Sequence, residues 1–171
     1  MKKDFVAPVL VLTLICLLIT AILAVTNSAT APKIEADKLA RANTMLLEII
    51  PEAESFEPVT ANALPASVTQ AYKSTNNVGL VFIVTADGYG GEMKIICGIS
   101  PEGQIISCKT MEHNETQGIG TRVTDEGFTE TLAGKDASLE GISAVSGATI
   151  SSKAYLGALA DAFDAFEAVK G

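Results

Sequence analysis

The chain has 171 residues, a net charge of -8 and a hydrophobic content of 48%, and these values exclude several classes of protein. Such an acidic chain offers no basic stripe to neutralise nucleic-acid phosphates, so we expect no nucleic acid among its partners. Once an apolar N-terminal segment is set aside, the length suffices for one domain of ordinary size with one core.

The N-terminal segment is predicted to cross a membrane once. Residues 5–25 contain no charged side chain, and these 21 residues, at about 1.5 Å each, match the roughly 30 Å hydrocarbon core of a bilayer. Lys2 and Lys3 precede this stretch, so the positive-inside rule places residues 1–4 in the cytoplasm and the rest of the chain outside. A cleaved signal peptide is the alternative, since residues 29–31 (Ala-Thr-Ala) resemble a cleavage site, but the apolar run exceeds the roughly 7–15 residues usual there.

The segment after the predicted span begins with a polar linker over residues 26–33. Apolar residues at helical spacing then predict an amphipathic helix over residues 34–50, which Pro51 ends. Three prolines among residues 51–78 indicate irregular chain, with a short helix over residues 67–72.

Three strands are predicted in the middle of the chain, over residues 80–85, 93–99 and 104–111. They are rich in apolar and β-branched residues, and two glycine-containing turns separate them. This pattern indicates an antiparallel meander. Strands in the middle with helices at both ends predict one α+β domain over residues 34–171.

Two helices are predicted after the strands. The first is short, over residues 124–133, and holds Phe128 and Leu132. The second is a long amphipathic helix over residues 153–169 with an apolar face toward the core. The apolar residues of that face, at spacings of three and four, are Tyr155, Leu159, Ala162, Phe166 and Val169.

The three cysteines fit no metal or cluster spacing. Cys16 lies in the predicted span, and Cys97 and Cys108 lie on successive predicted strands. If Glu102 and Gly103 form a tight turn, the latter two cysteines are nearly opposite each other. A disulfide and a pair of buried free thiols both remain open, and we favour the free thiols.

Residues 146–152 (Ser-Gly-Ala-Thr-Ile-Ser-Ser) place one threonine hydroxyl, that of Thr149, among small residues just before the long helix. Unpaired backbone N–H groups and the macrodipole favour an anion at a helix N-terminus. Ser151 or Ser152 can act as the N-cap. Taken alone, the segment suits either a phosphate site or a capping loop without a ligand.

Three sequence blocks together resemble the RnfG and NqrC family of FMN-binding proteins. Residues 146–149 match the flavinylation motif Ser/Thr-Gly-Ala-Thr, and residues 113–120 are similar to the segment His-x-Glu-Thr-Pro-Gly-Leu-Gly. Residues 88–91 (Gly-Tyr-Gly-Gly) are similar to a turn that precedes a core strand in that family. The blocks stand in the expected order behind one span, and the resemblance covers about residues 34–170.

The resemblance implies that Thr149 carries FMN through a phosphoester bond made by a flavin transferase. It also implies further residues around the cofactor, namely Ser146, Gly147, Ala148, Ser151, Ser152, Glu115, Thr116, Gly118, Gly120 and His113. Among these, Glu115 and Thr116 are expected to hydrogen-bond the isoalloxazine edge or the ribityl chain. Two positions depart from the family pattern: Ser143 stands where an aspartate is frequent, and Gln117 replaces a proline.

The function that the resemblance implies is electron transfer within a membrane complex. Rnf-type complexes couple electron transfer between ferredoxin and NAD to Na⁺ or H⁺ movement, so we expect other membrane subunits as partners. The sequence offers no NAD site or iron–sulfur spacing, which makes the chain a translocase subunit and not a complete enzyme. The alternatives are a flavin domain of another extracytoplasmic reductase, NqrC-like or unrelated, and a pilin-like structural protein. Pilins need a glutamate in the apolar helix, and residues 5–25 contain none.

Overall fold

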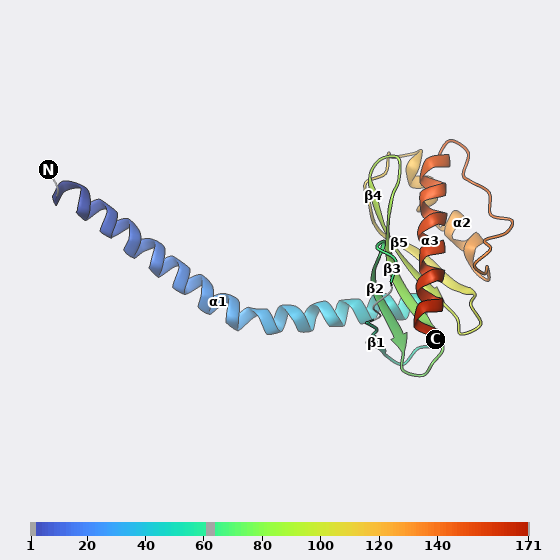
Figure 1. Cartoon of the computed structure of the whole chain (residues 1–171), viewed down its shortest axis with the longest axis horizontal. Coiled ribbons are helices and arrows are strands. Elements are labelled where there is room, and N and C mark those ends of the chain that lie inside the picture. The colour runs from blue at the N-terminus through green and yellow to red at the C-terminus, as the bar shows by residue number, and fades with distance from the viewer. Residues whose placement is uncertain (1–2, 61–63, 171) are drawn as a thin grey trace. The chain divides into compact units, whose positions relative to one another are not determined.

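The computed structural model describes residues 3–60 and 64–170, and it divides the chain into two compact units, Met1–Ala42 and Asn43–Gly171 (Figure 1). Met1 and Lys2, on which the predicted orientation partly depends, lie outside the described residues.

The first unit is formed by the helix α1, Lys3–Ile49, whose end belongs to the second unit. Side chains are described for residues 9–24, and the large apolar ones among them are exposed. The hydroxyls of Thr13 and Thr20 donate to backbone carbonyls one turn earlier in the same helix, so their hydrogen bonds are satisfied within α1. Residues 26–33, the predicted linker, are helical. Within the described part of the chain, no helix meets the length and hydropathy of a membrane span.

The second unit is built on a five-stranded antiparallel sheet in the order β1-β2-β3-β4-β5, as the α+β prediction requires (Figure 1). Its strands are β1 Phe56–Pro58, β2 Val68–Ser74, β3 Leu80–Asp87, β4 Glu92–Ile99 and β5 Ile105–His113. The last three confirm the predicted meander. At the turn between β4 and β5, the Gly103 N–H donates to the Ser100 carbonyl at 2.9 Å, and Gly103 has φ +81°.

The prediction of irregular chain with a short helix over residues 67–72 is wrong, because this segment forms strand β2. A register shift between Val68 and Gln70 interrupts the alternation of the strand. As a result, Val68 and Ala71, three residues apart as on one face of a helix, are buried in the same core. The edge strand β1 is too short to give a pattern of its own.

Helix α3, Thr149–Lys170, covers one face of the sheet over β3 and β4. Four residues of its predicted apolar face are buried, and Val169 is half-buried at the edge of this core. The helix begins four residues before the predicted start, so Ser151 and Ser152 lie in its first turn and are not N-caps. The short helix α2, Glu126–Thr129, continues as a 3₁₀ turn, η2, over Glu130–Leu132. These elements confirm the predicted short helix.

The opposite face of the sheet is covered by the end of α1. Leu46, Ile49 and Ile50 form a second buried cluster with residues of β3 and β4. Gly98 makes this packing possible: a Cβ there would lie 2.6 Å from Cγ2 of Ile49 and 3.0 Å from Cγ1 of Ile50. The predicted amphipathic helix thus ends as expected, next to Pro51.

Cys97 and Cys108 are directly opposite each other in the β4–β5 pair, as predicted. Both are buried free thiols, and the Cys108 thiol donates to Cys97 Sγ at 2.8 Å. Burial raises the pKa of Cys108 well above its usual value. The pair therefore behaves as part of the core below α3.

Candidate cofactor-binding site

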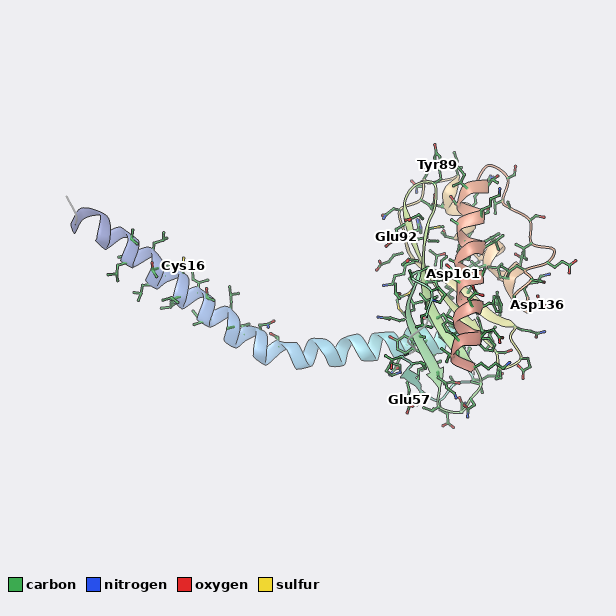
Figure 2. All side chains as sticks on the ribbon, in the orientation of Figure 1. Cys16, Glu57, Tyr89, Glu92, Asp136 and Asp161 are labelled. Carbon is green, nitrogen blue, oxygen red and sulfur yellow. The ribbon has the colours of Figure 1, made fainter. Side chains whose placement is uncertain are left out.

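A cavity of about 400 Å³ lies at the N-terminal end of α3. It is lined by Tyr89, Ile119, Gly120, Gly147, Ala148, Thr149, Ile150 and Ser151. Each of the three sequence blocks singled out above contributes to this lining, although they are far apart in the chain. Figure 2 shows Tyr89 at the end of the domain where α3 begins.

Thr149 is the first residue of α3 and is exposed at the cavity. The two residues before it are small for different reasons. Gly147 has φ +84°, and a Cβ there would meet no atom within 4 Å, so the backbone conformation and not the space favours glycine. Ala148 is buried, and its methyl group belongs to the core under α3. Together they hold the threonine hydroxyl at the surface.

The hydroxyls of Ser151 and Ser152 are bound by backbone groups. The Tyr89 N–H donates to Ser151 Oγ at 3.3 Å, and the Val145 N–H donates to Ser152 Oγ at 2.9 Å. Both serines are fully buried. They fasten two loops to the first turn of α3, and only Ser151 also lines the cavity.

Glu115 is buried behind the cavity wall and not in the cavity. Its Oε2 accepts a hydrogen bond from the Gly90 N–H at 3.1 Å, while Oε1 has no partner among the described residues. Gly88 and Gly120 lie against the same carboxylate. The structure thus brings Glu115 to the glycines of two sequence blocks.

Four other predicted site residues do not line the cavity, namely Ser146 and the three described next. His113 is exposed at the end of β5, where it pairs with Met93 of β4. Thr116 is exposed, and its carbonyl accepts from the Gly120 N–H at 2.9 Å. Gly118 has φ +80°, and its N–H donates to Thr121 Oγ1 at 3.0 Å. Thr116 and Gly118 shape the turn that presents Gly120 to the cavity.

Arg122 is a candidate site residue that the sequence did not indicate. It lies in the 3₁₀ helix η1, Gly120–Val123, and its Nη1 donates to the Ser146 carbonyl at 3.3 Å. This bond places a permanent positive charge beside the loop that ends at Thr149. The only sequence signal was its position two residues after the Gly118-Ile119-Gly120 turn.

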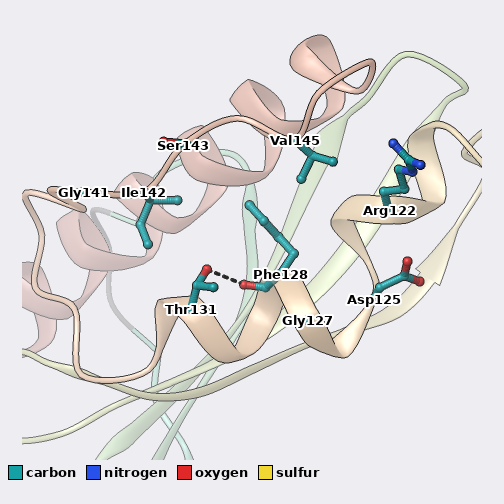
Figure 3. A pocket seen from close by; sticks show the side chains of 9 residues that line it. All are labelled: Arg122, Asp125, Gly127, Phe128, Thr131, Gly141, Ile142, Ser143 and Val145. Atoms are coloured by element: carbon teal, nitrogen blue, oxygen red, sulfur yellow. Dashed lines mark hydrogen bonds between the residues drawn. The ribbon is translucent and has the colours of Figure 1, made fainter.

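Arg122 also borders a second pocket, of about 490 Å³ (Figure 3). In Figure 3, Phe128 lies between Ile142 on one side and Arg122 on the other. Ser143, which stands where the resembling family often has an aspartate, lines this pocket. The segment that leads to Thr149 therefore contributes to two pockets, residues 141–143 and 145 to this one and residues 147–149 to the cavity.

The chemistry of the site follows from these groups. An exposed hydroxyl at a helix N-terminus with a guanidinium nearby suits a phosphate ester. Tyr89, Ile119 and Ile150 give the cavity large exposed apolar side chains that suit a flat ring system. In the described part of the chain, no three His, Cys, Asp or Glu side chains are grouped to hold a metal ion.

Comparison with known families gives two matches. Residues 88–164 match the FMN-binding domain, and residues 1–49 match the RnfG N-terminal region. The first match contains all three sequence blocks that form the cavity. The second contains the whole of α1.

Comparison with individual proteins gives relatives named as G subunits. The G subunit of the ion-translocating oxidoreductase complex of Methanosarcina acetivorans is 31% identical over 185 residues, which cover 99% of this chain and 98% of that protein. The protein of the same name from Shewanella piezotolerans is 32% identical over 136 residues, 72% of this chain but only 64% of that longer relative. The G subunit of the Na⁺-translocating ferredoxin:NAD⁺ oxidoreductase complex of Acetobacterium woodii is 30% identical, covering 85% of this chain and 83% of the relative.

Proposed function

Because the chain belongs to the RnfG family, the G subunits of ion-translocating oxidoreductase complexes, we propose that it carries electrons through FMN bonded covalently to Thr149. When bound, FMN supplies the redox chemistry, and the protein holds and orients it. The complex would couple ferredoxin:NAD oxidoreduction to Na⁺ or H⁺ translocation; the name of the Acetobacterium woodii relative states the Na⁺ form for its own complex. Other membrane subunits of such a complex are the expected partners.

The observation that carries the proposal is the exposed Thr149 at the start of α3, next to a cavity of about 400 Å³. The residues present fit FMN. The Arg122 guanidinium donates a hydrogen bond to the carbonyl of Ser146, which lies three residues before Thr149. Its positive charge would stabilise a phosphate on the threonine. The first N–H groups of α3 add to this stabilisation.

The cavity walls suit the rest of the cofactor. Tyr89, Ile119 and Ile150 are each more than half exposed, at 71%, 52% and 57%. Such side chains cost free energy when they face water, and a ring placed against them removes that apolar surface from solvent. Tyr89 also offers an aromatic face for stacking.

The bond to Thr149 requires a second protein, a flavin transferase that takes FMN from FAD. The threonine hydroxyl loses its proton while its Oγ forms a bond to phosphorus. The pyrophosphate bond of FAD breaks, and AMP is the leaving group. The transferase must reach Thr149 from outside, which its exposed position permits.

We also propose that residues 5–25 of α1 cross the membrane once, with residues 1–4 in the cytoplasm and the second unit outside. The absence of charged residues over this stretch supports the span, as do the exposed apolar side chains from Val9 to Leu23. A fixed anchor and a permanent cofactor together keep a loaded carrier at high effective concentration for its partner subunits.

Family membership favours the Rnf assignment over a flavin domain of another extracytoplasmic reductase, and it leaves the pilin-like alternative without support. The test is the intact mass of the full chain produced with and without a flavin transferase. We expect a gain of one FMN only with the transferase, and no gain for Thr149→Ala. An unchanged mass of the wild-type chain in the presence of the transferase would overturn the proposal.

A further inference from the structure

We propose that Glu115 is a positioning residue: its buried carboxylate fixes the two loops that carry Tyr89 and Ile119 to the cavity beside Thr149. This inference rests on the proposed function. It replaces the direct contact with the cofactor that the sequence suggested, because the Glu115 side chain is only 8% exposed and is not part of the cavity lining.

The Glu115 carboxylate is hydrogen-bonded to the loop before β4. Glu115 Oε2 accepts from the Gly90 N–H at 3.1 Å. The neighbouring N–H, that of Tyr89, donates to Ser151 Oγ at the start of α3. Consecutive amides of this loop are thus bound to two different elements, which fixes the backbone that bears Tyr89.

Three glycines approach Glu115 closely. A Cβ on Gly88 would lie 1.6 Å from Oε1, and a Cβ on Gly120 would lie 2.1 Å from Oε2. A Cβ on Gly90 would lie 2.8 Å from Cα of Glu115. Glycine at positions 88 and 120 leaves room for the carboxylate, and glycine at position 90 leaves room for the backbone of residues 114–116. None of the three has a positive φ, so their need for glycine arises from space and not from backbone conformation.

Two side chains that line the cavity depend on the position of Glu115. Tyr89 stands between Gly88 and Gly90, and Ile119 precedes Gly120, so both exposed apolar side chains are attached directly to the backbone that Glu115 holds. Burying a carboxylate with one oxygen unpaired costs free energy. An apolar residue would fill this position without that cost. We attribute the presence of a glutamate to the loop geometry that its carboxylate imposes.

The test uses the full chain produced with a flavin transferase, as wild type, Glu115→Ala, Glu115→Gln and Gly120→Ala. For Glu115→Ala we expect amide hydrogen exchange of Gly90 to rise about tenfold or more, the effect of losing one hydrogen bond to a charged acceptor. Gly120→Ala should have the same effect, because its Cβ displaces Oε2. Glu115→Gln keeps an acceptor oxygen and should retain the slow exchange. Gly157→Ala is the matched control, since a Cβ there meets no atom within 4 Å.

A spectroscopic cycle separates positioning from general destabilisation. A tyrosine ring in contact with a flavin quenches its fluorescence, so Glu115→Ala should increase the fluorescence of the loaded protein. In a Tyr89→Leu background the same substitution should cause no further increase. The positioning role is refuted if Glu115→Ala changes the fluorescence equally in both backgrounds, or if Glu115→Gln behaves like Glu115→Ala in hydrogen exchange. A wild-type chain without FMN would refute the proposed function instead, while hydrogen exchange would still report whether the carboxylate fixes the loop.

Discussion

Tyr155 offers a quantitative test of the core below α3, the helix that begins at the proposed attachment residue Thr149. Its side chain is fully buried and packs edge-to-face on Phe128, with ring centroids 5.6 Å apart. The hydroxyls of Tyr155 and Thr110 are near enough to influence ionisation, yet neither has a partner in hydrogen-bonding geometry. Burial, with a smaller contribution from Cys108, raises the pKa of Tyr155 far above its usual value of 10.0.

This raised pKa makes stability depend on pH in a defined direction. Below the pKa that Tyr155 has in the unfolded chain, its phenol is neutral in both states, and the stabilising contribution of the buried phenol is fully present. Above it, the unfolded state loses a proton while the folded state retains its own, so the free energy of unfolding falls as pH rises. At pH 11, about one unit above the unfolded value, the loss is about 1.4 kcal/mol.

We expect Tyr155→Phe to remove this loss. The free energy of unfolding of the variant minus that of the wild type should grow by about 1.4 kcal/mol between pH 7 and pH 11. The assay is guanidinium unfolding of the full chain in detergent with a reductant present, followed by circular dichroism. Tyr72→Phe is the control, because the Tyr72 hydroxyl is exposed and bonded to Gln70. An equal difference at both pH values for Tyr155→Phe would refute the reasoning.

Three further predictions concern single residues. Gly98→Ala should lower the free energy of unfolding by about 1–3 kcal/mol, because the new Cβ overlaps Ile49; thermal unfolding checks this, and an unshifted midpoint would contradict it. Gly147→Ala should cost about 1–2 kcal/mol through its φ of +84° alone, so the loss should appear in unfolding even without the transferase. Arg122→Gln should slow flavinylation and reduce its salt dependence, measured as the rate of mass gain; a rate equal to the wild type would remove Arg122 from the site.

The regular parts of the fold were predictable from composition and, for the last helix, from period. Strands β3 and β4 each bury five consecutive residues, and β3, β4 and β5 were recognisable as apolar and β-branched runs bounded by glycine-containing turns. Helix α3 was recognisable because its buried residues recur at spacings of three and four. Strand β2 was missed because it has few large apolar residues and its register shift places Val68 and Ala71, three residues apart, in the same core. The start of α3 was misplaced because Ser151 and Ser152 resemble caps, whereas their hydroxyls bind the amides of Tyr89 and Val145.

The site was predictable as a set of blocks but not as a set of contacts. Thr149, Gly147 and Gly120 do line one cavity. The inward position of Glu115 could not be read from the sequence, since a glutamate between exposed neighbours gives no sign of burial. Arg122 was missed because its partner is a backbone carbonyl 24 residues away, which no local pattern encodes.

The place of Thr149 limits how an attached cofactor can travel. The residue opens a 22-residue helix whose buried face is packed against the sheet, so the point of attachment cannot swing as a loop would. Any reach toward a donor or an acceptor must come from the rotatable bonds of the threonine side chain, the phosphate and the ribityl chain. A neighbouring protein that needs a longer reach must itself approach.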